Sequence, residues 1–478
     1  MRTPTLRGHT PRAATAPVAP STRPAPAGRA TAPGPDLARP PALSGDFTAD
    51  RAAVTAHLQA AVERIAGYGP RTGRTPAAQR HAATVHEEAH DLRRRFLAAH
   101  AERVYAELTD GRTRSLRLEE LTEQAARAFP GLVPTRTQLA EDSRHLQRNK
   151  EGWEVAVGLF FQAVLNAPAA GEHLLRAMLR PTGRALDALP GYQLTGHADL
   201  GVATVTRRDG IAHLELCNDE FLNAEDDAAV EALETGTDLV LLDPASHVGV
   251  LRGAPQTHPS YAGRRVFSAG INLTHLYHGD ISLLGFMLRR EAGYLAKFVR
   301  GLCLDDTHGD GWWPDADKPW VAAVDSFAIG GGMQILPVMD RVVAADDAWF
   351  SLPAMEEGLV PGLANLRLLH LTGSRAARRL ILGGRTLRAS DPEAAHIVDE
   401  TVPADTMDTA VDRAARHLDH PAVGANRRML ALAEEPTGLF RRYLARYAYE
   451  QARLLHSPAL ITTLERTWIH RTARKDSR

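Results

Sequence analysis

A glycine-rich turn in the second half of the chain could supply backbone N–H groups to a negatively charged oxygen. The stretch AIGGGMQIL, Ala328–Leu336, places three glycines between an apolar run and a helix-compatible segment. The first N–H groups of a helix are free and carry a partial positive charge, and glycine lets a ligand atom approach the backbone closely. Such a turn can stabilise an oxyanion that forms during a reaction, although it is equally compatible with a tight packing turn.

A second turn of this kind lies upstream, in the stretch RRVFSAGINL, Arg264–Leu273. Two turns that each follow a strand could direct two N–H donors at one oxygen. Gln334 follows the glycines where many enzymes place a carboxylate. An amide donates and accepts hydrogen bonds, but it cannot act as a general base near neutral pH. The pattern therefore favours stabilisation of charge over proton transfer by this residue.

The segments around the two turns predict a mixed α/β layer. Alternating apolar residues on both sides of Asp209–Gly210 predict a hairpin, and short apolar runs predict further strands. Strands that alternate with helices indicate a mostly parallel sheet. The strands predicted after the hairpin lie at residues 237–243, 247–252, 319–327, 340–346 and 348–353, and a helix is predicted over 281–302.

Both ends of the chain differ from this middle part. Apolar residues at spacings of three and four predict helices from residue 46 to 180 and again from residue 365 onward. The first 45 residues are rich in Pro, Ala and Arg and too poor in apolar residues to offset the entropy of ordering, so we expect them to be disordered. We divide the chain into a tail at 1–45, a helical domain at 46–200, an α/β core at 201–405 and a C-terminal helical region at 406–478.

Composition argues against several classes of partner. The 478 residues carry a formal net charge of −1, so no global attraction draws the protein to nucleic acid or to an anionic membrane. The two cysteines, Cys217 and Cys303, show no metal or disulfide spacing, which is typical of a reducing compartment. No stretch reaches the apolar length of a membrane span. We therefore expect a cytoplasmic protein with neither nucleic-acid nor membrane partners.

Two stretches imitate metal sites. HEEAH, His86–His90, matches the H-E-x-x-H pattern of zinc peptidases, but Phe96 stands where the longer form of that motif has its third histidine. DDTHGDGWW, residues 305–313, resembles half a calcium loop, but histidine is a poor calcium ligand and the twelfth position is Asp317. We interpret them as a solvated helix face and a polar loop, and we predict no metal site.

Several stretches, in order along the chain, resemble the crotonase, or enoyl-CoA hydratase/isomerase, superfamily. FSAGINL, Phe267–Leu273, is similar to the first signature of that family, and Ala328–Leu336 is similar to the second. Further similar stretches lie at residues 216–233, 349–362 and 378–403, so the resemblance covers roughly residues 200 to 405. It implies a core of ββα turns arranged in a spiral and a coenzyme A thioester as substrate.

The resemblance also implies roles for particular residues. The N–H groups of Ile271 and Gly331 would hold the thioester oxygen as an enolate forms. Tyr261 and residues of the first motif would lie near coenzyme A. These motif residues are Ala269, Gly270, Asn272 and Leu273. The C-terminal helices would assemble trimers, and two trimers could stack into a dimer of trimers.

The chain departs from the hydratase pattern at both catalytic carboxylates. Gln334 and Ala354 stand where hydratases carry the acids that handle water, and only a shift of register would bring Glu356 or Glu357 into place. With the helical N-terminus and an inserted loop at 252–264, these departures resemble a branch that oxidises an arylacetyl-CoA with O2, using neither metal nor flavin. A thioesterase or isomerase of the same fold, or an acyl-CoA-binding protein without activity, remains the alternative.

Three polar residues are predicted to surround the aryl ring and the thioester. Glu225 follows the Asn223–Ala224 pair and could accept a hydrogen bond from a phenol, although an acid at a helix N-terminus is also stabilised there without any ligand. In the predicted helix at 281–302, Arg290 lies at the edge of the apolar face, whereas Arg289 lies on the polar face. Arg290 is therefore the better candidate for the pocket, its alternative being a rim arginine. Gln334 would form hydrogen bonds near the thioester or oxygen.

Overall fold

Helices form the first part of the described chain, as the apolar spacing predicts. The computed structural model describes residues 38–304 and 315–475, so most of the predicted tail at 1–45 and the stretch 305–313 lie outside the described residues. Asp46 caps the first helix by accepting a hydrogen bond from Ala49 N (2.8 Å), and Thr75 caps the second. The helices are α1 (Phe47–Gly67), α2 (Pro76–Leu108), α3 (Leu118–Ala128), α4 (Arg136–Asp142), α5 (Glu154–Asn166), α6 (Pro168–Met178) and α7 (Gly183–Thr195).

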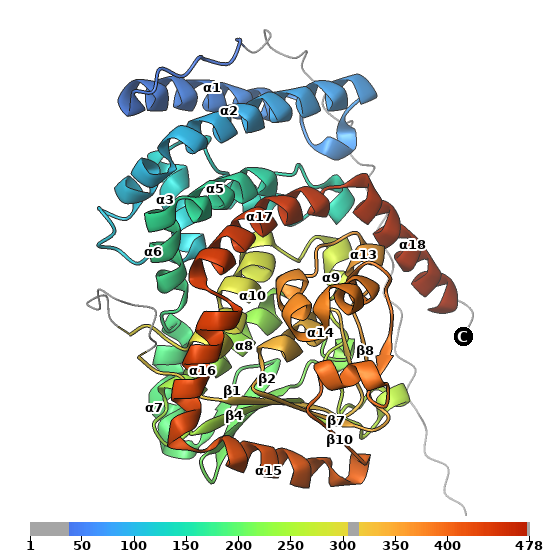
Figure 1. The fold of residues 1–478 in the computed structure, drawn as a ribbon. Coiled ribbons are helices and arrows are strands. Elements are labelled where there is room, and N and C mark those ends of the chain that lie inside the picture. The colour runs from blue at the N-terminus through green and yellow to red at the C-terminus, as the bar shows by residue number, and fades with distance from the viewer. Residues whose placement is uncertain (1–37, 305–314, 476–478) are drawn as a thin grey trace, which may run out of the picture.

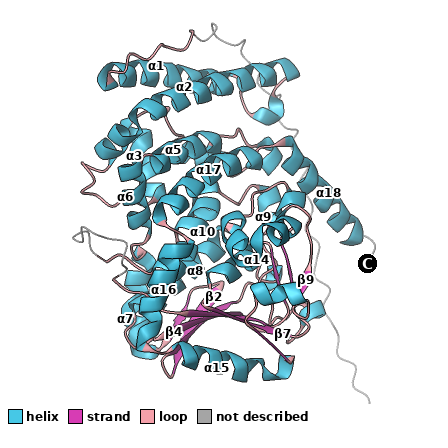
Figure 2. Ribbon diagram, in the orientation of Figure 1, coloured by secondary structure: helices cyan, strands magenta, loops and turns pink. Residues whose placement is uncertain are grey.

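The core is built on a seven-stranded sheet, which Figure 2 shows edge-on above α15 (Met407–Leu418). The strands nearest the N-terminus are antiparallel, and those from β3 to β10 run parallel to their neighbours. This agrees with the mostly parallel sheet that the sequence predicts. In spatial order the strands are β1 (His197–Asp199), β2 (Ala203–Arg208), β3 (Ile211–Leu216), β4 (Val248–Gly253), β5 (Trp320–Val324), β7 (Arg341–Ala345) and β10 (Glu400–Val402).

The predicted hairpin is confirmed. Arg208 pairs with Ile211 across a two-residue turn in which Asp209 and Gly210 have φ angles of 48° and 80°. Positive φ at both turn residues suits the right-handed twist of the flanking strands, and Asp-Gly is a favoured pair at these positions. The sequence therefore determines this corner of the sheet locally.

A smaller, three-stranded sheet carries the second glycine turn. Its strands are β6 (Phe327–Ile329), β8 (Trp349–Ser351) and β9 (Leu387–Arg388), with β6 parallel to β8. The short helix α12 (Gly331–Ile335) follows β6 directly and ends in the 3-10 turn Leu336–Val338, which contains Pro337. Proline lacks the backbone N–H that a longer α-helix would need, so α12 remains short. The glycines lie at the start of this short helix.

Two sequence-based predictions of elements are wrong. The apolar run at 237–243 was expected to form a strand, but it is the end of α8 (Asp227–Leu242). A short apolar run does not distinguish a buried strand from a buried helix, and Thr235 to Leu241 are all buried in α8.

The predicted helix at 281–302 is not continuous. A π-helical turn at Leu283–Leu288 leads into α10 (Arg289–Ala292), and α11 (Tyr294–Arg300) follows after a break at Gly293 (φ −93°, ψ −111°). A Cβ at Gly293 would meet Arg289 O and the carboxylate of Glu234, so only glycine fits at the break. The break changes the direction of the residues that follow Arg290.

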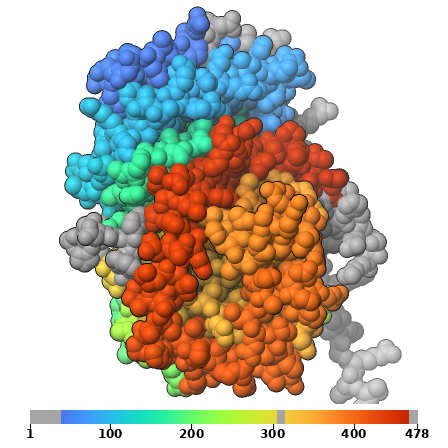
Figure 3. Space-filling view, in the orientation of Figure 1, coloured from blue at the N-terminus to red at the C-terminus, as the bar shows by residue number. Residues whose placement is uncertain are grey.

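The C-terminal helices run back over the core toward the N-terminal helices. Helix α17 (Thr437–Leu455) packs against α5, and Figure 3 shows the C-terminal segment lying between the N-terminal helices and the core. The remaining helices are α9 (Leu273–His278), α13 (Ala354–Glu357), α14 (Ala364–Ile381), α16 (Pro421–Glu434) and α18 (Pro458–Lys475). In the described chain no single helix has the length and apolar composition to cross a membrane; only the bent pair Glu154–Asn166 and Pro168–Thr195 passes that test together.

Candidate active site

The two glycine turns lie against each other. Ser268 forms a parallel bridge with Ala328, and Ile329 N donates to Ser268 O (2.9 Å). Gly270 (φ +87°) and Gly330 (φ +50°) are in left-handed conformations that favour glycine. A Cβ added to Gly270 would lie 3.0 Å from Ile329 O, so a larger residue would push the turns apart.

In the first turn, hydrogen bonding leaves one backbone N–H free. The amides on both sides of Ile271 are occupied: Gly270 N donates to Ser268 Oγ (3.1 Å) and Asn272 N donates to Glu225 O (2.8 Å). Ile271 N has no acceptor among the residues that the structure describes. Its N–H is therefore available to an external oxygen.

The second turn presents another amide of this kind. Gly330 N donates to Ser351 O (2.8 Å), and Gly331 is the first residue of α12. The first N–H groups of a helix have no acceptor within the helix. Gly331 and Ile271 line one and the same cavity, so the distant turns present their amides to a shared space.

The cavity is small, and its wall is partly polar. The space open to water-sized molecules is ≈ 40 Å³, which is room for about three waters. Arg290 and Gln334 lie in its wall beside Ile271 and Gly331. The other lining residues are Phe286, Met287, Glu291, Gly330, Ala354, Glu357, Leu359, Val360, Gly362, Tyr447 and Gln451.

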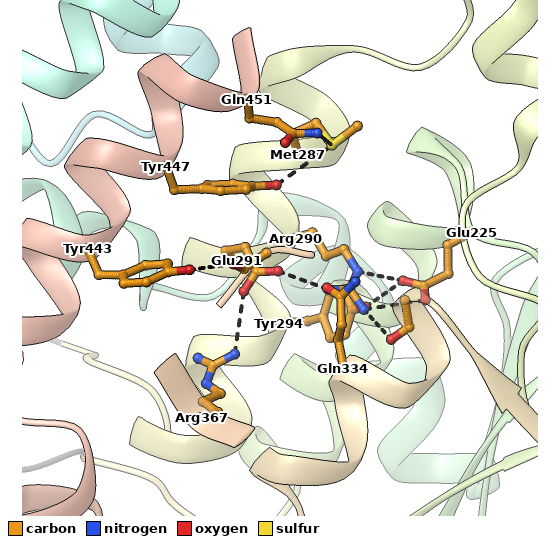
Figure 4. Close-up of polar contacts among 12 residues, drawn as sticks. Glu225, Met287, Arg290, Glu291, Tyr294, Gln334, Arg367, Tyr443, Tyr447 and Gln451 are labelled. Carbon is orange, nitrogen blue, oxygen red and sulfur yellow. Dashed lines mark hydrogen bonds and ion pairs between the residues drawn. The ribbon is translucent and has the colours of Figure 1, made fainter. Parts of the chain in front are cut away.

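Arg290 connects the polar side of the cavity to a buried network (Figure 4). The arginine side chain is 4% exposed; its Nη1 donates to Gln334 Oε1 (3.0 Å) and its Nη2 to Gly331 O (2.6 Å). Its Nε donates to Glu225 Oε2 (2.8 Å), and Nη1 also contacts Glu291 Oε1 (2.9 Å). Burial alone would lower the pKa of this guanidinium, but the neighbouring carboxylates raise it well above its ordinary value. Arg290 is therefore a permanent cation beside the cavity.

Glu225 lies behind Arg290 and not in the cavity wall. Its carboxylate is fully buried and accepts from Arg290 and from Tyr294 OH (2.7 Å). A Cβ added to Gly331 would clash with Glu225 Oε1, so the glycine lets α12 approach this carboxylate. Direct contact of Glu225 with a substrate ring stays a prediction, and in this structure the residue positions Arg290.

The other predicted binding residues surround the first turn. The ring of Tyr261 packs on Phe327 with centroids 5.3 Å apart, outside the small cavity. Asn272 is buried and caps α9 by accepting from His275 N (3.1 Å). Gly270 is buried against β6, whereas two further residues of the turn are partly exposed and do not line the cavity. These two are Ala269 and Leu273.

Helix α17 contributes residues that the sequence patterns did not indicate, and Glu357, which the sequence offered only with a shift of register, lines the cavity together with Ala354. Tyr447 and Gln451 lie one turn apart on α17, and both contact Met287 Sδ (3.7 and 3.3 Å). Glu357 lies on α13, where burial and the nearby charge of Glu356 raise its pKa to about 7. The amphipathic pattern of α17 predicts a buried face, but nothing local predicts which cavity that face meets.

The residues that imitate a zinc motif serve structural contacts. On α2, His86 Nε2 lies 2.9 Å from the Oε1 atom of Glu151, which precedes α5. Burial lowers the pKa of His90, on the same helix, to about 2. Within residues 38–304 and 315–475 there is no cluster of three or more potential metal ligands. The stretch that resembles a calcium loop, 305–313, falls outside the described residues.

Comparison with known proteins agrees with the motifs. The enoyl-CoA hydratase/isomerase family matches residues 312–458. The chain is 51% identical to a (3,5-dihydroxyphenyl)acetyl-CoA 1,2-dioxygenase from Amycolatopsis orientalis, over 88% of this chain and 96% of that protein. It is 26% identical to the 2,3-dehydroadipyl-CoA hydratase of Escherichia coli (strain K12), over 45% of this chain and 75% of that one. Among solved structures, an enoyl-CoA hydratase/isomerase from Pseudoalteromonas atlantica T6c aligns with a TM-score of 0.47 and 20% identity, covering 56% of this chain and 97% of its own.

Proposed function

The chain belongs to the crotonase superfamily, and we propose that it is a dioxygenase that converts (3,5-dihydroxyphenyl)acetyl-CoA and O2 to 3,5-dihydroxyphenylglyoxylate and CoA. The observation that carries the proposal is the 51% identity that extends over 96% of the dioxygenase from Amycolatopsis orientalis. A match of this extent includes the helical N-terminus as well as the core. The product suggests a role in making dihydroxyphenylglycine for antibiotic biosynthesis.

The two free amides would supply the first requirement of this reaction, an oxyanion hole. The Cα–H of an arylacetyl thioester is acidified by both the ring and the carbonyl, and its loss places negative charge on the thioester oxygen. Donors from Ile271 and Gly331 would hold that oxygen, and removal of one such donor typically costs about 3 kcal/mol of transition-state stabilisation. The geometry that supports this role is the shared cavity of the two turns.

The rest of the reaction follows from the electron-rich enolate. One electron passes from the enolate to O2, and the two radicals combine to a peroxide at Cα. The peroxide attacks the thioester carbonyl and expels CoA thiolate. Cleavage of the O–O bond with loss of the second Cα–H then leaves the keto acid, so that both oxygen atoms of O2 and both Cα protons are accounted for. Electron transfer from carbon to O2 needs neither metal nor flavin, and we propose that none takes part.

The buried polar residues would orient the substrate in this scheme. Gln334 lies in the cavity wall and offers its amide N–H groups to the ring hydroxyls or to the thioester. Arg290, also in the wall, adds positive charge there, and Glu225 fixes its guanidinium from behind. Tyr261 and the first-motif residues would contact the CoA portion. We further propose the four-part division of the chain, assembly into trimers or dimers of trimers through the C-terminal helices, and a cytoplasmic location.

Oxygen uptake tests the proposed function. Addition of (3,5-dihydroxyphenyl)acetyl-CoA is expected to consume one O2 for each CoA released, with a rate that a metal chelator does not change. CoA release without oxygen uptake would identify a thioesterase instead, and binding without turnover would identify an acyl-CoA-binding protein.

The oxyanion hole has its own test in a pair of variants. Gly331→Pro removes the N–H, whereas Gly331→Ala keeps the N–H and adds only the Cβ that clashes with Glu225. We expect the proline variant to be slower than the alanine variant by about 100-fold or more, because one oxyanion donor is worth about that much in kcat. Equal rates for the two variants, with the alanine variant still active, would show that the Gly331 amide does not hold the oxyanion.

A further inference from the structure

The proposed reaction needs a group that removes the first Cα proton, and few groups in the cavity wall can do so. Gln334 is an amide, and Arg290 is held as a cation by its carboxylate neighbours. Glu291 is 1% exposed and engaged with Arg290 (2.9 Å) and Arg367 (3.4 Å). The hydroxyl of Tyr447 has a pKa well above its ordinary value because it is buried. None of these four groups is a free base near neutral pH.

Glu357 differs from all of them. It lines the cavity from α13, on the same face as Ala354, because residues three apart on a helix lie one above the other. Within the described residues its carboxylate has no hydrogen bond and no ion pair, whereas Glu225 and Glu291 are both paired with Arg290. The side chain is half-buried and lines the cavity, so its carboxylate oxygens are available to accept a proton from a substrate.

We propose that Glu357 is the general base that takes the Cα proton of the thioester substrate. This inference rests on the proposed function. Among the described residues, Glu357 is the one carboxylate in the cavity wall that forms no ion pair, because Glu291 is paired with Arg290 and Arg367. The electron pair of the C–H bond moves into the enolate, whose oxygen is held by the amides of Ile271 and Gly331. The carboxylic acid that forms returns its proton to the thiolate sulfur, which leaves as CoA thiol.

The electrostatic surroundings of Glu357 agree with this role. Burial and then the charge of Glu356 raise its pKa to about 7. A base with a pKa near the working pH combines a large ionised fraction with strong proton affinity, and general bases of this kind contribute about 100- to 10,000-fold. The other charged or titratable side chains that line the cavity are Arg290, Glu291 and Tyr447. Helix α18, which packs against α13, carries Glu465, and that carboxylate is paired with Arg148.

Exchange of the Cα proton in the absence of oxygen tests the base directly. Full-length protein is mixed with (3,5-dihydroxyphenyl)acetyl-CoA in deuterated buffer under argon, and deuterium incorporation is followed by proton NMR. We expect Glu357→Gln to slow exchange by about 100-fold or more, while Glu231→Gln, a change at a half-exposed residue of α8 that does not line the cavity, retains it. Exchange in Glu357→Gln within threefold of the wild-type rate would overturn the proposal.

The pH dependence of exchange adds a readout that a purely structural role would not change. The carboxylate is the active form, so the wild-type rate should fall below a pH of about 7 as Glu357 becomes protonated. Glu356→Gln removes a negative neighbour, lowers the pKa of Glu357 and should move that fall to lower pH. An unchanged profile in Glu356→Gln would contradict the assignment.

Two further measurements separate a lost base from a lost fold or a wrong function. Glu357→Asp keeps a carboxylate and should exchange faster than Glu357→Gln; equal rates in the two variants would overturn the proposal even if both were destabilised. Retained affinity for a CoA amide analogue would show that the Gln variant still binds. If the wild-type protein exchanges the Cα proton but consumes no O2, the proposed dioxygenase activity is rejected and the assignment of the base stands. If the wild-type protein consumes O2 and Glu357→Gln exchanges the Cα proton at the wild-type rate, only the assignment of the base is rejected.

Discussion

Arg289 and Arg290 are neighbours on α10, yet they enter two different buried ion networks. On one side, the fully buried Glu234 accepts from Arg289 Nε (2.6 Å), Arg117 Nη2 (2.5 Å) and Lys297 Nζ (2.8 Å). On the other side, Arg290 binds Glu225, Glu291, Gln334 and the carbonyl oxygen of Gly331. Both networks join fully buried carboxylates to arginines, so composition does not distinguish them.

The difference lies in what each network faces. The Glu234 network lies away from the cavity: Lys297 also bonds Asp238 Oδ1 (2.7 Å), none of its members lines the cavity, and its two arginines are 17% exposed. Burial alone would raise the pKa of Glu234, but Lys297 and the two arginines hold it well below its ordinary value. The Arg290 network is open on one side, toward the two free amides. A buried charge indicates a functional site only where it also faces accessible space.

The largest expected effect is on stability, in the Glu234 network. Glu234→Gln leaves three cations without their shared anion, and breaking a buried ion pair in this way costs about 3–5 kcal/mol. Urea unfolding should show that loss, while O2 uptake per folded molecule stays within about twofold, because no member of the network touches the cavity. A decrease in the free energy of unfolding below about 1 kcal/mol would show that the Glu234 network contributes little to the stability of the fold.

The open network should respond in activity. Glu225→Gln weakens the contact that orients Arg290, and a misplacement of about 1 Å near the reacting atoms can reduce the rate about 100-fold. Stability should fall less than in Glu234→Gln, because Glu291 still pairs with Arg290 (2.9 Å). The measurement is O2 uptake at saturating substrate, with Glu231→Gln, a change at a half-exposed residue of α8, as the control. Unchanged uptake in Glu225→Gln would remove the functional distinction between the networks.

A third cluster extends the open network toward α16 and predicts a pH effect. Burial alone would raise the pKa of Glu435, but Arg367 and Arg300 lower it from 4.5 to about 2. A carboxylate with a lowered folded-state pKa adds stability above pH 4.5, and this contribution is lost as the pH falls toward 2. The stability difference between wild type and Glu435→Gln should therefore shrink between pH 4.5 and 2 in urea unfolding. A constant difference would mean that these ion pairs do not stabilise the fold.

The smallest effect is expected at an exposed pair. Arg95 and Asp91 lie four residues apart on α2 with side chains that are 42% and 55% exposed. Solvent screens such pairs, so Asp91→Asn should change stability by no more than about 0.5 kcal/mol. A larger change in urea unfolding would show that burial is not what separates these pairs from the networks around Glu234 and Arg290.

Several elements could be predicted because local rules determine them. The Asp209–Gly210 hairpin follows from turn chemistry, and the N-terminal helices follow from apolar residues at spacings of three and four. The run at 237–243 was misassigned because a buried helix and a buried strand look alike over seven residues. The break at Gly293 was missed because its cause, the close approach of Glu234, comes from a distant segment.

The sequence by itself determined the two glycine turns, the amide at Gln334 and their order along the chain, since motif and spacing are local properties. Only the tertiary structure decided that Glu225 lies behind Arg290, that Arg289 and Arg290 diverge, and that Glu357 shares a cavity with Ile271. The physical reason is that the periodicity of a helix determines which of its residues share a face. Which segment packs against that face depends on contacts between parts of the chain that are far apart in sequence.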